Sequence, residues 1–270
     1  MGARTELGAR SPELGASSDL RPPTSELSMV VSIFRLIIDP PRSAARNMAV
    51  DEMLLLSRSE KGVPVLRFYE WSEPSVTAGY FQDLRRVAGK FNAEKKIIPV
   101  VKRLSGGGAV LHGEDLTFSL SIAVSNPFFP TDVKSSYLKI NEALRVGLKN
   151  DLPKLDYADC KTVAPKKKQS DDRVCFDSPA CYDLLLSGKK VLGSSQRRIG
   201  KTLLHQSSVF LKLKKELLRR RIAEGFEKVW KVNFKESPLS KKELGEAEKI
   251  EKNRYASSEW ALLRDLSLRS

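Results

Sequence analysis

The residues best suited to chemistry form a glycine-rich segment at positions 103–112, with the sequence RLSGGGAVLH. Apolar runs at 97–101 and 116–124 flank it, and both are typical of strands. Three successive glycines let the backbone adopt positive φ and approach a bound group closely. Their amide groups would form a concave donor site for a carbonyl or phosphate, with Arg103 adding positive charge at its mouth.

Taken alone, the three glycines also fit a flexible hairpin loop, and without further context that interpretation is favoured. Two nucleotide-binding motifs are excluded. The segment is not a Walker loop, because no Gly-Lys-Ser/Thr follows at the required spacing. It is not a dinucleotide-binding fingerprint either, because no helical pattern begins directly after it. The chemistry of the segment therefore depends on the residues that the rest of the chain places around it.

Composition indicates a soluble globular protein with a basic surface. The chain has 270 residues, of which 41% are hydrophobic and 30% charged, so it can bury a sizeable core. No apolar run approaches the roughly 18 residues of a membrane span, and we expect no membrane partner. The net charge of +14 implies an acidic partner. A nucleic-acid-binding module would explain the charge, but no zinc-finger or RNA-binding signature accompanies it, and an acidic carrier protein fits equally well.

The cysteines and the N-terminal residues indicate the cellular setting. Cys160, Cys175 and Cys181 do not make a disulfide framework and lack the spacing of zinc ligands, so we expect no metal site and a reducing cytoplasm. Residues 1–28 are rich in Ser, Gly, Pro and Ala without periodicity, which predicts a disordered extension. They lack the apolar core of a signal peptide. We expect residues 30–270 to form a single domain.

Hydrophobic patterning predicts an α+β fold, with mixed, largely antiparallel sheets and packed helices. Besides the two strands beside the glycines, strands are expected at 30–38, 65–69, 75–80, 182–186, 189–192 and 203–213. Helices are expected at 47–56, 82–87, 135–148 and 214–230, with one or two more within 239–263. Asn47 is the expected N-cap of the first helix.

Six segments, in order along the chain, resemble the superfamily of lipoate–protein ligases, octanoyltransferases and biotin–protein ligases. They are NMAVDE at 47–52, RFYEWSEP at 67–74, GYFQ at 79–82, the glycine-rich segment, GKKVLGSSQRR at 188–198 and NRYASSEW at 253–260. Each segment alone is a moderate signal, but the ordered set is specific. The resemblance implies a catalytic domain of the class II biotin/lipoate-ligase type.

Within that superfamily the chain is most similar to octanoyltransferases of the LipM type. The segment VCFDSP at 174–179 decides this, because a cysteine at the position of Cys175 accepts the acyl group in that branch, whereas ATP-using lipoate ligases typically lack it. The resemblance implies transfer of octanoyl from acyl carrier protein, through a thioester on Cys175, to a lysine of the glycine cleavage H protein or an E2 lipoyl domain. A thioester donor requires no ATP, so no cofactor is expected.

The resemblance also implies roles for the other site residues. Lys190 matches the active-site lysine, which would hold the acyl carbonyl and favour the thiolate; its neighbour Lys189 should point the opposite way on a strand. His112 would orient the acceptor amine or stabilise the glycine-rich segment. The residues expected to bind substrate beside them are Arg103, Ser105, Gly106, Gly107, Gly108, Gly193 and Ser194.

Departures from the family pattern concern three places. Cys181 lies where relatives often carry an aromatic residue, and is either a second thiol near the site or, preferably, part of the core. Residues 205–208 lack the glycine that is usual there, which puts their backbone geometry in doubt. The Lys-rich segment 160–168 has no family role, and we expect it to help dock acidic carriers.

Two alternative activities fit the same residues. An amidotransferase, moving octanoyl from one lipoyl domain to another, would use the same cysteine. An ATP-dependent lipoate–protein ligase would use ATP and Mg²⁺, with Lys190 and the glycines holding an acyl-adenylate and Cys175 incidental.

Overall fold

A six-stranded mixed sheet is the central element of the fold. The computed structural model describes residues 32–57, 62–91, 98–127, 129–161, 174–176 and 179–257. In spatial order the strands are β10 (Leu192–Ile199), β11 (Thr202–Val209), β6 (Leu116–Ala123), β2 (Val65–Tyr69), β1 (Ser32–Ile38) and β12 (Val232–Glu236). The first four pair antiparallel, whereas β2, β1 and β12 pair parallel. The predicted α+β class with mixed, largely antiparallel strands is therefore confirmed.

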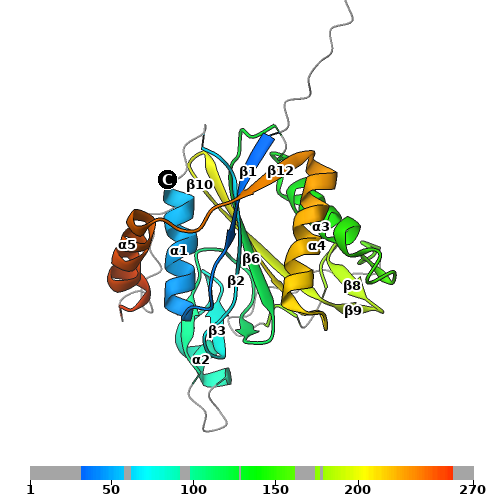
Figure 1. The fold of residues 1–270 in the computed structure, drawn as a ribbon. Helices are drawn as coiled ribbons and strands as arrows, with labels where there is room; N and C mark the ends of the chain where they lie inside the picture. Colours follow the sequence, from blue (N-terminus) through cyan, green and yellow to red (C-terminus); the bar gives the residue numbers. More distant parts are fainter. Residues whose placement is uncertain are drawn as a thin grey trace, which may run out of the picture. The chain divides into compact units, whose positions relative to one another are not determined.

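Helices cover both faces of this sheet (Figure 1). On one face lie α1 (Ala44–Leu56), α5 (Lys241–Ile250) and a π-helical turn (Glu251–Tyr255); on the other lie α3 (Val133–Leu148) and α4 (Lys215–Trp230). This arrangement explains why every residue of β2, β6 and β11 is buried, polar ones included. The polar side chains of these strands must therefore find partners inside the protein.

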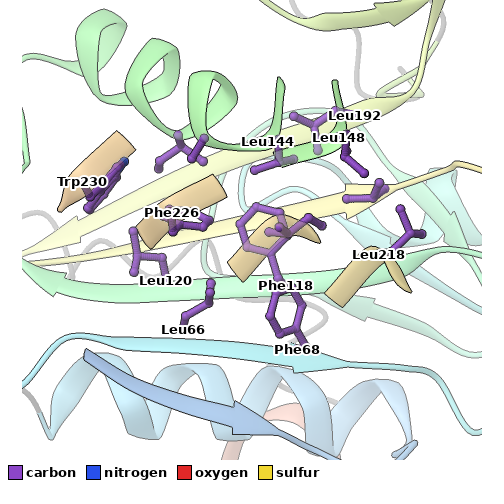
Figure 2. Packing of buried hydrophobic residues seen from close by; sticks show 14 of the residues in the cluster. Leu66, Phe68, Phe118, Leu120, Leu144, Leu148, Leu192, Leu218, Phe226 and Trp230 are labelled. Atoms are coloured by element: carbon purple, nitrogen blue, oxygen red, sulfur yellow. The ribbon is translucent and has the colours of Figure 1, made fainter. Parts of the chain in front are cut away.

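The larger apolar layer lies between the sheet and helices α3 and α4 (Figure 2). Phe118 and Leu120 of β6 face Phe226 and Trp230 of α4. Phe226 meets both Phe118 and Trp230 edge-on, with ring centroids 6.2 Å and 5.2 Å apart. Such contacts add about 0.5–1.5 kcal/mol beyond the burial of the rings. Because α3 belongs to this layer, its first turns are held beside β10, where they line the site described below.

Two smaller sheets contain the segments whose residues could take part in a reaction. β4 (Val100–Lys102), β3 (Ser75–Ala78) and β5 (Val110–His112) form one in that order, and the glycine-rich segment connects β4 to β5. Helix α2 (Leu84–Phe91) packs against it. The other sheet contains β7 (Leu155–Tyr157), β8 (Leu184–Leu186) and β9 (Lys189–Lys190).

The structure differs from the predicted elements in detail. The Ser43 hydroxyl, not Asn47, caps α1 by accepting from the Arg46 amide. Asn47 is instead fully buried, and its amide donates to the Glu70 carbonyl at 2.9 Å. Hydrophobic patterning did not predict β5, β7 or β12, which have three, three and five residues. Residues 205–208 belong to the regular strand β11 although the usual glycine is missing.

Several predictions concern residues outside the described ranges. They are the disordered extension at 1–28, most of the Lys-rich segment at 160–168 and the end of the segment at 253–260. The single-domain assignment of residues 30–270 stays a prediction. Within the described residues, none of the helices combines the length and apolarity needed to cross a membrane.

A buried ion cluster joins α1 to the sheet. Arg67 of β2 is fully buried and forms ion pairs with Asp39 and Asp51, each at 2.7 Å. Its guanidinium also donates to the side-chain oxygen of Asn47 at 2.7 Å. Asp51 accepts in addition from the Tyr69 hydroxyl at 2.9 Å. Charges this far from water are stable only when each is paired and hydrogen-bonded.

Replacing Arg67 by methionine should leave the buried Asp51 carboxylate without its cation and leave Asp39 with Arg42 alone, 2.8 Å away. We expect the free energy of unfolding, measured in urea, to fall by about 3–5 kcal/mol. The matched control is Arg220→Met. Arg220 is 64% exposed and forms a loose ion pair with Glu224 at 3.8 Å, so its replacement should lower the free energy of unfolding by less than about 1 kcal/mol. Equal losses in the two variants would refute the importance of the cluster.

His205 of β11 determines part of the pH dependence of stability. It is fully buried, its Nδ1 accepts from the Gln196 amide at 3.1 Å and its Nε2 lies 2.6 Å from the Ser207 hydroxyl. Burial lowers the pKa of His205 to about 3, whereas an unfolded histidine titrates near about 6.5. Because the folded-state pKa is depressed, the unfolded state takes up the proton first, and stability falls as pH drops below about 6.5.

Urea unfolding at about pH 7.5 and about pH 5 should therefore differ by about 2 kcal/mol from this histidine alone. The His205→Gln variant keeps groups that can hydrogen-bond Gln196 and Ser207 but cannot titrate. Its loss over the same pH interval should be smaller by that amount, and an unchanged loss would contradict the assignment.

Candidate active site

Two cavities meet at Cys175. The larger, of about 350 Å³, lies between the glycine-rich segment, α3, β10 and the residues that precede β8. The smaller, of about 20 Å³, lies beside Arg103 and His112. It has room for roughly one water molecule. Cys175, Ser194 and Ser195 line both cavities, so the thiol lies where the two spaces join.

Cys175 is held by main-chain contacts to the glycine-rich segment. Its N–H donates to the Ala109 carbonyl at 2.9 Å, and Val174 forms a parallel β-bridge with Ala109. The residue is 9% exposed and keeps a free thiol. Residues 177–178 of the VCFDSP segment lie outside the described ranges. The nucleophile predicted from sequence is thus placed directly against the glycine-rich segment.

Lys190 lies on β9 with its ammonium against the segment of the nucleophile. Its Nζ forms an ion pair with Asp183 Oδ2 at 2.7 Å and donates to the main-chain carbonyl of Cys175 at 3.1 Å. Lys189 is exposed, in agreement with the alternation of a strand. A cation placed here can stabilise negative charge on a thiolate or on a reacting carbonyl oxygen.

Arg103 lies beneath the glycine-rich segment and not at its mouth. Its guanidinium, on a residue 4% exposed, donates to the carbonyls of Gly106 at 2.6 Å, Gly108 at 2.8 Å and Thr77 at 3.0 Å. The expectation of positive charge at the mouth was therefore wrong. Arg103 lines the smaller cavity and shapes the segment from within, because its donors hold the glycine carbonyls.

Glycine is required at two places in this packing. Gly107 has a φ of 93°, which side chains rarely adopt. A β-carbon at Gly79 would collide with the carbonyl oxygen of Gly107. Gly106, Gly107 and Gly108 all line the larger cavity. They therefore bring main chain, not side chains, to the cavity wall beside the nucleophile.

Ser105 anchors the glycine-rich segment to the buried ion cluster. It is fully buried and lines neither of the two cavities. Its hydroxyl donates to Gln206 Oε1 at 2.6 Å and lies 2.7 Å from the Ser195 hydroxyl. Gln206 donates in turn to Asp51 Oδ2 at 2.7 Å. A direct contact of Ser105 with substrate stays a prediction, since its present partners are all within the protein.

Gly193 and Ser194 begin β10 next to the nucleophile. Ser194 lines both cavities, and its hydroxyl lies 2.7 Å from the Ser207 hydroxyl. A β-carbon at Gly193 would lie 2.8 Å from the Phe176 ring and 3.1 Å from the Cys175 sulfur. The segment of the nucleophile can therefore pack on β10 only because residue 193 has no side chain.

His112 has both ring nitrogens engaged. Nδ1 lies 2.9 Å from Asp115 Oδ2, Nε2 lies 2.9 Å from the Thr77 hydroxyl, and the ring stacks on Trp71 with centroids 3.9 Å apart. Burial raises the pKa of Asp115, but the charge and hydrogen bond of His112 and the Thr117 hydroxyl outweigh it, so the pKa lies below its usual value. These contacts favour stabilisation of the glycine-rich segment over orientation of the acceptor amine.

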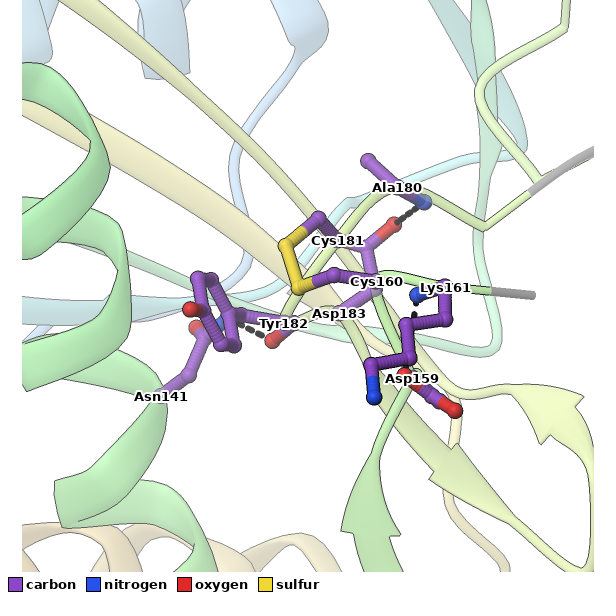
Figure 3. Close-up of a disulfide and its surroundings, with 8 residues drawn as sticks. All are labelled: Asn141, Asp159, Cys160, Lys161, Ala180, Cys181, Tyr182 and Asp183. Carbon is purple, nitrogen blue, oxygen red and sulfur yellow. Dashed lines mark hydrogen bonds between the residues drawn. A yellow bond between two sulfur atoms is a disulfide. The ribbon is translucent and has the colours of Figure 1, made fainter. Parts of the chain in front are cut away.

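Cys160 and Cys181 form a disulfide, with Cα atoms 4.5 Å apart (Figure 3). This overturns two expectations: that the three cysteines do not make a disulfide framework, and that Cys181 is a second thiol or a core residue. The two are 21 residues apart in sequence, and the antiparallel pairing of β7 with β8 brings them together. Cys181 also lines the larger cavity.

Asp183 is a site residue that the sequence reasoning missed. Its carboxylate pairs with Lys190 at 2.7 Å and accepts from the Ala180 amide at 2.6 Å. No motif marks it. Its place between Cys175 and Lys190 along the chain was the only available signal.

Residues 43–242 match the family described as the lipoyl protein ligase A/B catalytic domain. The chain belongs to this family. An octanoyltransferase LipM of Carboxydothermus hydrogenoformans is 34% identical over 259 residues, which covers 81% of this chain and 94% of that relative. The octanoyltransferase LipM of Bacillus subtilis is 30% identical, over 84% of this chain and 97% of that relative. The resemblance seen in the six motifs is therefore confirmed.

Solved structures of family members share the fold. A crystal structure of a lipoate–protein ligase A bound with ATP superimposes with a TM-score of 0.69, at 21% identity, and covers 85% of this chain and 98% of that chain. A Thermoplasma acidophilum protein, a putative lipoate protein ligase with bound lipoic acid, gives 0.70 at 22% identity, over 85% and 98% of the two chains. The predicted lipoate-ligase type of catalytic domain is confirmed by these likenesses, which at such identity concern the fold alone.

Gly193→Ala should displace the segment of the nucleophile without unfolding the family fold. The added methyl would crowd the Phe176 ring and the Cys175 sulfur, and this strain should change the rate at which iodoacetamide alkylates Cys175 by about tenfold, about 1.4 kcal/mol. The matched control is Gly89→Ala in α2, where a β-carbon meets no other atom within 4 Å. An unchanged alkylation rate in Gly193→Ala would show that the close packing is not needed.

Proposed function

We propose that this chain is an octanoyltransferase of lipoate biosynthesis, with Cys175 as its nucleophile. The carrying observation is the free thiol of Cys175 at the junction of two cavities, with the Lys190 ammonium against its main chain. The relatives named octanoyltransferase align over 94% and 97% of their own length and support the same reaction. A thiol beside a cavity of about 350 Å³ can react first with an acyl donor and then, as a thioester, with an acceptor amine.

In the first step the Cys175 thiolate attacks the carbonyl carbon of an octanoyl thioester. The bond to the carrier sulfur breaks, the carrier thiol leaves with the electron pair and takes a proton, and an octanoyl thioester forms on Cys175. The reaction exchanges one thioester for another, so it requires no additional activation. The larger cavity, of about 350 Å³, supplies the route to the thiol.

In the second step the amine of a target lysine attacks the acyl-enzyme. An amide forms, Cys175 leaves as a thiolate, and the amine loses a proton. Because an amide is more stable than a thioester, this step runs downhill without ATP. We therefore expect no cofactor.

Lys190 is proposed to support both steps electrostatically. Asp183 holds its ammonium at 2.7 Å, and the ammonium lies 3.1 Å from the Cys175 carbonyl oxygen. In that position its charge favours the thiolate before attack and the oxyanion that forms during attack. The main chain of Gly106 to Gly108, on the cavity wall, is proposed to lie along the acyl group.

The proposed partners are octanoyl-acyl carrier protein as donor and the glycine cleavage H protein or an E2 lipoyl domain as acceptor. A solved structure with a TM-score of 0.67 and 21% identity pairs a lipoate protein ligase with its E2 lipoyl domain in Thermoplasma acidophilum. The net charge of +14 is complementary to acidic partners of this kind. A cytoplasmic location is proposed with them.

Intact-mass spectrometry without ATP tests the proposal. Wild-type protein mixed with octanoyl-carrier protein should gain one octanoyl group, and adding apo H protein should move that group to the H protein. Cys175→Ser should gain none, because a serine hydroxyl is a far poorer nucleophile and leaving group at neutral pH. Lys190→Ala should acylate slower by about 10²–10³-fold. The matched control is Lys189→Ala, because Lys189 is exposed on the opposite side of β9.

Other outcomes separate the alternative activities. If wild-type protein gains no octanoyl group, and the H protein is modified only when ATP and free acid are supplied, the chain is a ligase. Octanoyl taken up from an octanoylated H protein, but not from the carrier, would establish an amidotransferase.

A further inference from the structure

The Cys160–Cys181 disulfide lies two residues from Asp183, the partner of Lys190 (Figure 3), and Cys175 lies between its two cysteines in sequence. We propose that it positions Lys190 and the segment of Cys175, so that reducing it slows acyl transfer. This inference rests on the proposed function. It assigns to the disulfide a positioning role, and to the site a dependence on the redox state of two cysteines that take no part in the chemistry.

The disulfide closes the open end of the β7–β8 ladder. Tyr157 pairs with Leu184 at the last position of the strands. Beyond it, the Ala158 amide donates to the Asp183 carbonyl at 2.7 Å, and the Tyr182 amide donates to the Ala158 carbonyl at 3.3 Å. Cys181 directly precedes Tyr182, and Cys160 follows Ala158 by two residues. Their Cα atoms are 4.5 Å apart, a separation that a disulfide can bridge. The bond therefore prevents this end of the ladder from opening.

The clamped residues carry the partner of Lys190. Tyr182 has a φ of 67°, which is unusual for an aromatic residue and needs support from its surroundings. Asn141 provides part of it by donating to the Tyr182 carbonyl at 2.9 Å. The next residue, Asp183, binds Lys190 at 2.7 Å. Strain at Tyr182 would be released if the disulfide opened, and Asp183 would move with it.

The same bond closes a covalent ring around the nucleophile. Cys160 and Cys181 are 21 residues apart, and Cys175 lies between them in sequence. Two hydrogen bonds hold this ring to the rest of the protein at Cys175. Its N–H donates to the Ala109 carbonyl, and its carbonyl accepts from Lys190 Nζ. If the residues of the ring detached from these contacts, the disulfide would limit the conformational entropy that they gain. The disulfide thus favours the attached position of the nucleophile.

Reduction changes the two cysteines and leaves Cys175 as it was. A dithiol reductant supplies two electrons and two protons, the sulfur–sulfur bond breaks into two thiols, and the reductant becomes a disulfide. Cys175 is a free thiol before and after. Any change in its reactivity would then come from position alone.

The test compares oxidised protein with protein treated with a phosphine, which reduces disulfides without consuming thioesters as a thiol would. Iodoacetamide should label one cysteine in the oxidised form and three in the reduced form. Single-turnover acylation of Cys175 by octanoyl-carrier protein should be slower in the reduced form on the order of fivefold or more. Reoxidation should restore the rate. Equal rates of measurable acylation in the two forms would overturn the proposal.

Two variants separate positioning from loss of structure. In the double variant Cys160→Ser/Cys181→Ser, Cys175 should be acylated at the slow rate whether or not the phosphine is present. A cooperative thermal transition above the assay temperature should show that this variant is folded. In Asp183→Asn the redox effect should shrink, because the disulfide acts through the Asp183–Lys190 pair. An undiminished redox effect in Asp183→Asn would overturn the positioning of Lys190 by the disulfide.

Alkylation of Cys175, resolved by peptide mass spectrometry, tests the inference without any octanoyl donor. It should be faster in the reduced form, because the buried thiol becomes more accessible when its segment detaches. If neither form is acylated but alkylation differs, the proposed function fails and the positioning role stands. If alkylation is the same in both forms, the positioning role fails whatever the activity.

Discussion

The structure depends above all on a fully buried guanidinium in the central sheet. Arg67 has no exposed surface, and its ion pairs with Asp39 and Asp51 hold α1 against the sheet. The connection continues outward, since Asp51 accepts from Gln206 and Gln206 accepts from Ser105 at the base of the glycine-rich segment. A charge in this position tolerates little displacement, because each lost partner leaves an unpaired group in a medium of low polarity. The site therefore inherits its rigidity from the core.

A second buried guanidinium shapes the site itself. Arg103 donates to the carbonyls of Gly106 and Gly108, and these contacts curl the main chain of the segment around a cation. Gly79 lets that main chain approach β3 closely, and Gly193 lets the nucleophile approach β10. Backbone and small residues thus form much of the wall beside Cys175. Lys190 adds an ammonium beside this wall, 3.1 Å from the main-chain carbonyl oxygen of Cys175.

The disulfide gives the site a feature that takes no part in the proposed chemistry, because Cys175 is a free thiol and is not one of its two cysteines. Disulfides are rare where glutathione keeps thiols reduced, and those that occur there are often regulatory. A bond between Cys160 and Cys181, one residue from Tyr182 and two from Asp183, is well placed for such a role. The predicted cytoplasmic setting and the disulfide are therefore compatible when the bond forms and opens with cellular conditions.

The sequence by itself determined the α+β class and the inward position of Lys190 relative to Lys189, because both follow from local properties: periodicity and the alternation of a strand. The predicted role of Cys175 came from the family motifs, whose order along the chain the sequence also shows. Only the tertiary structure decided that Arg103 lies inside the glycine-rich segment, that Cys160 binds Cys181 and that Asp183 holds Lys190. The pairing of β7 with β8 brings the two cysteines together, and β7 was not predicted from the sequence. Contacts between residues distant along the chain depend on strand pairing and register, which local patterns do not encode.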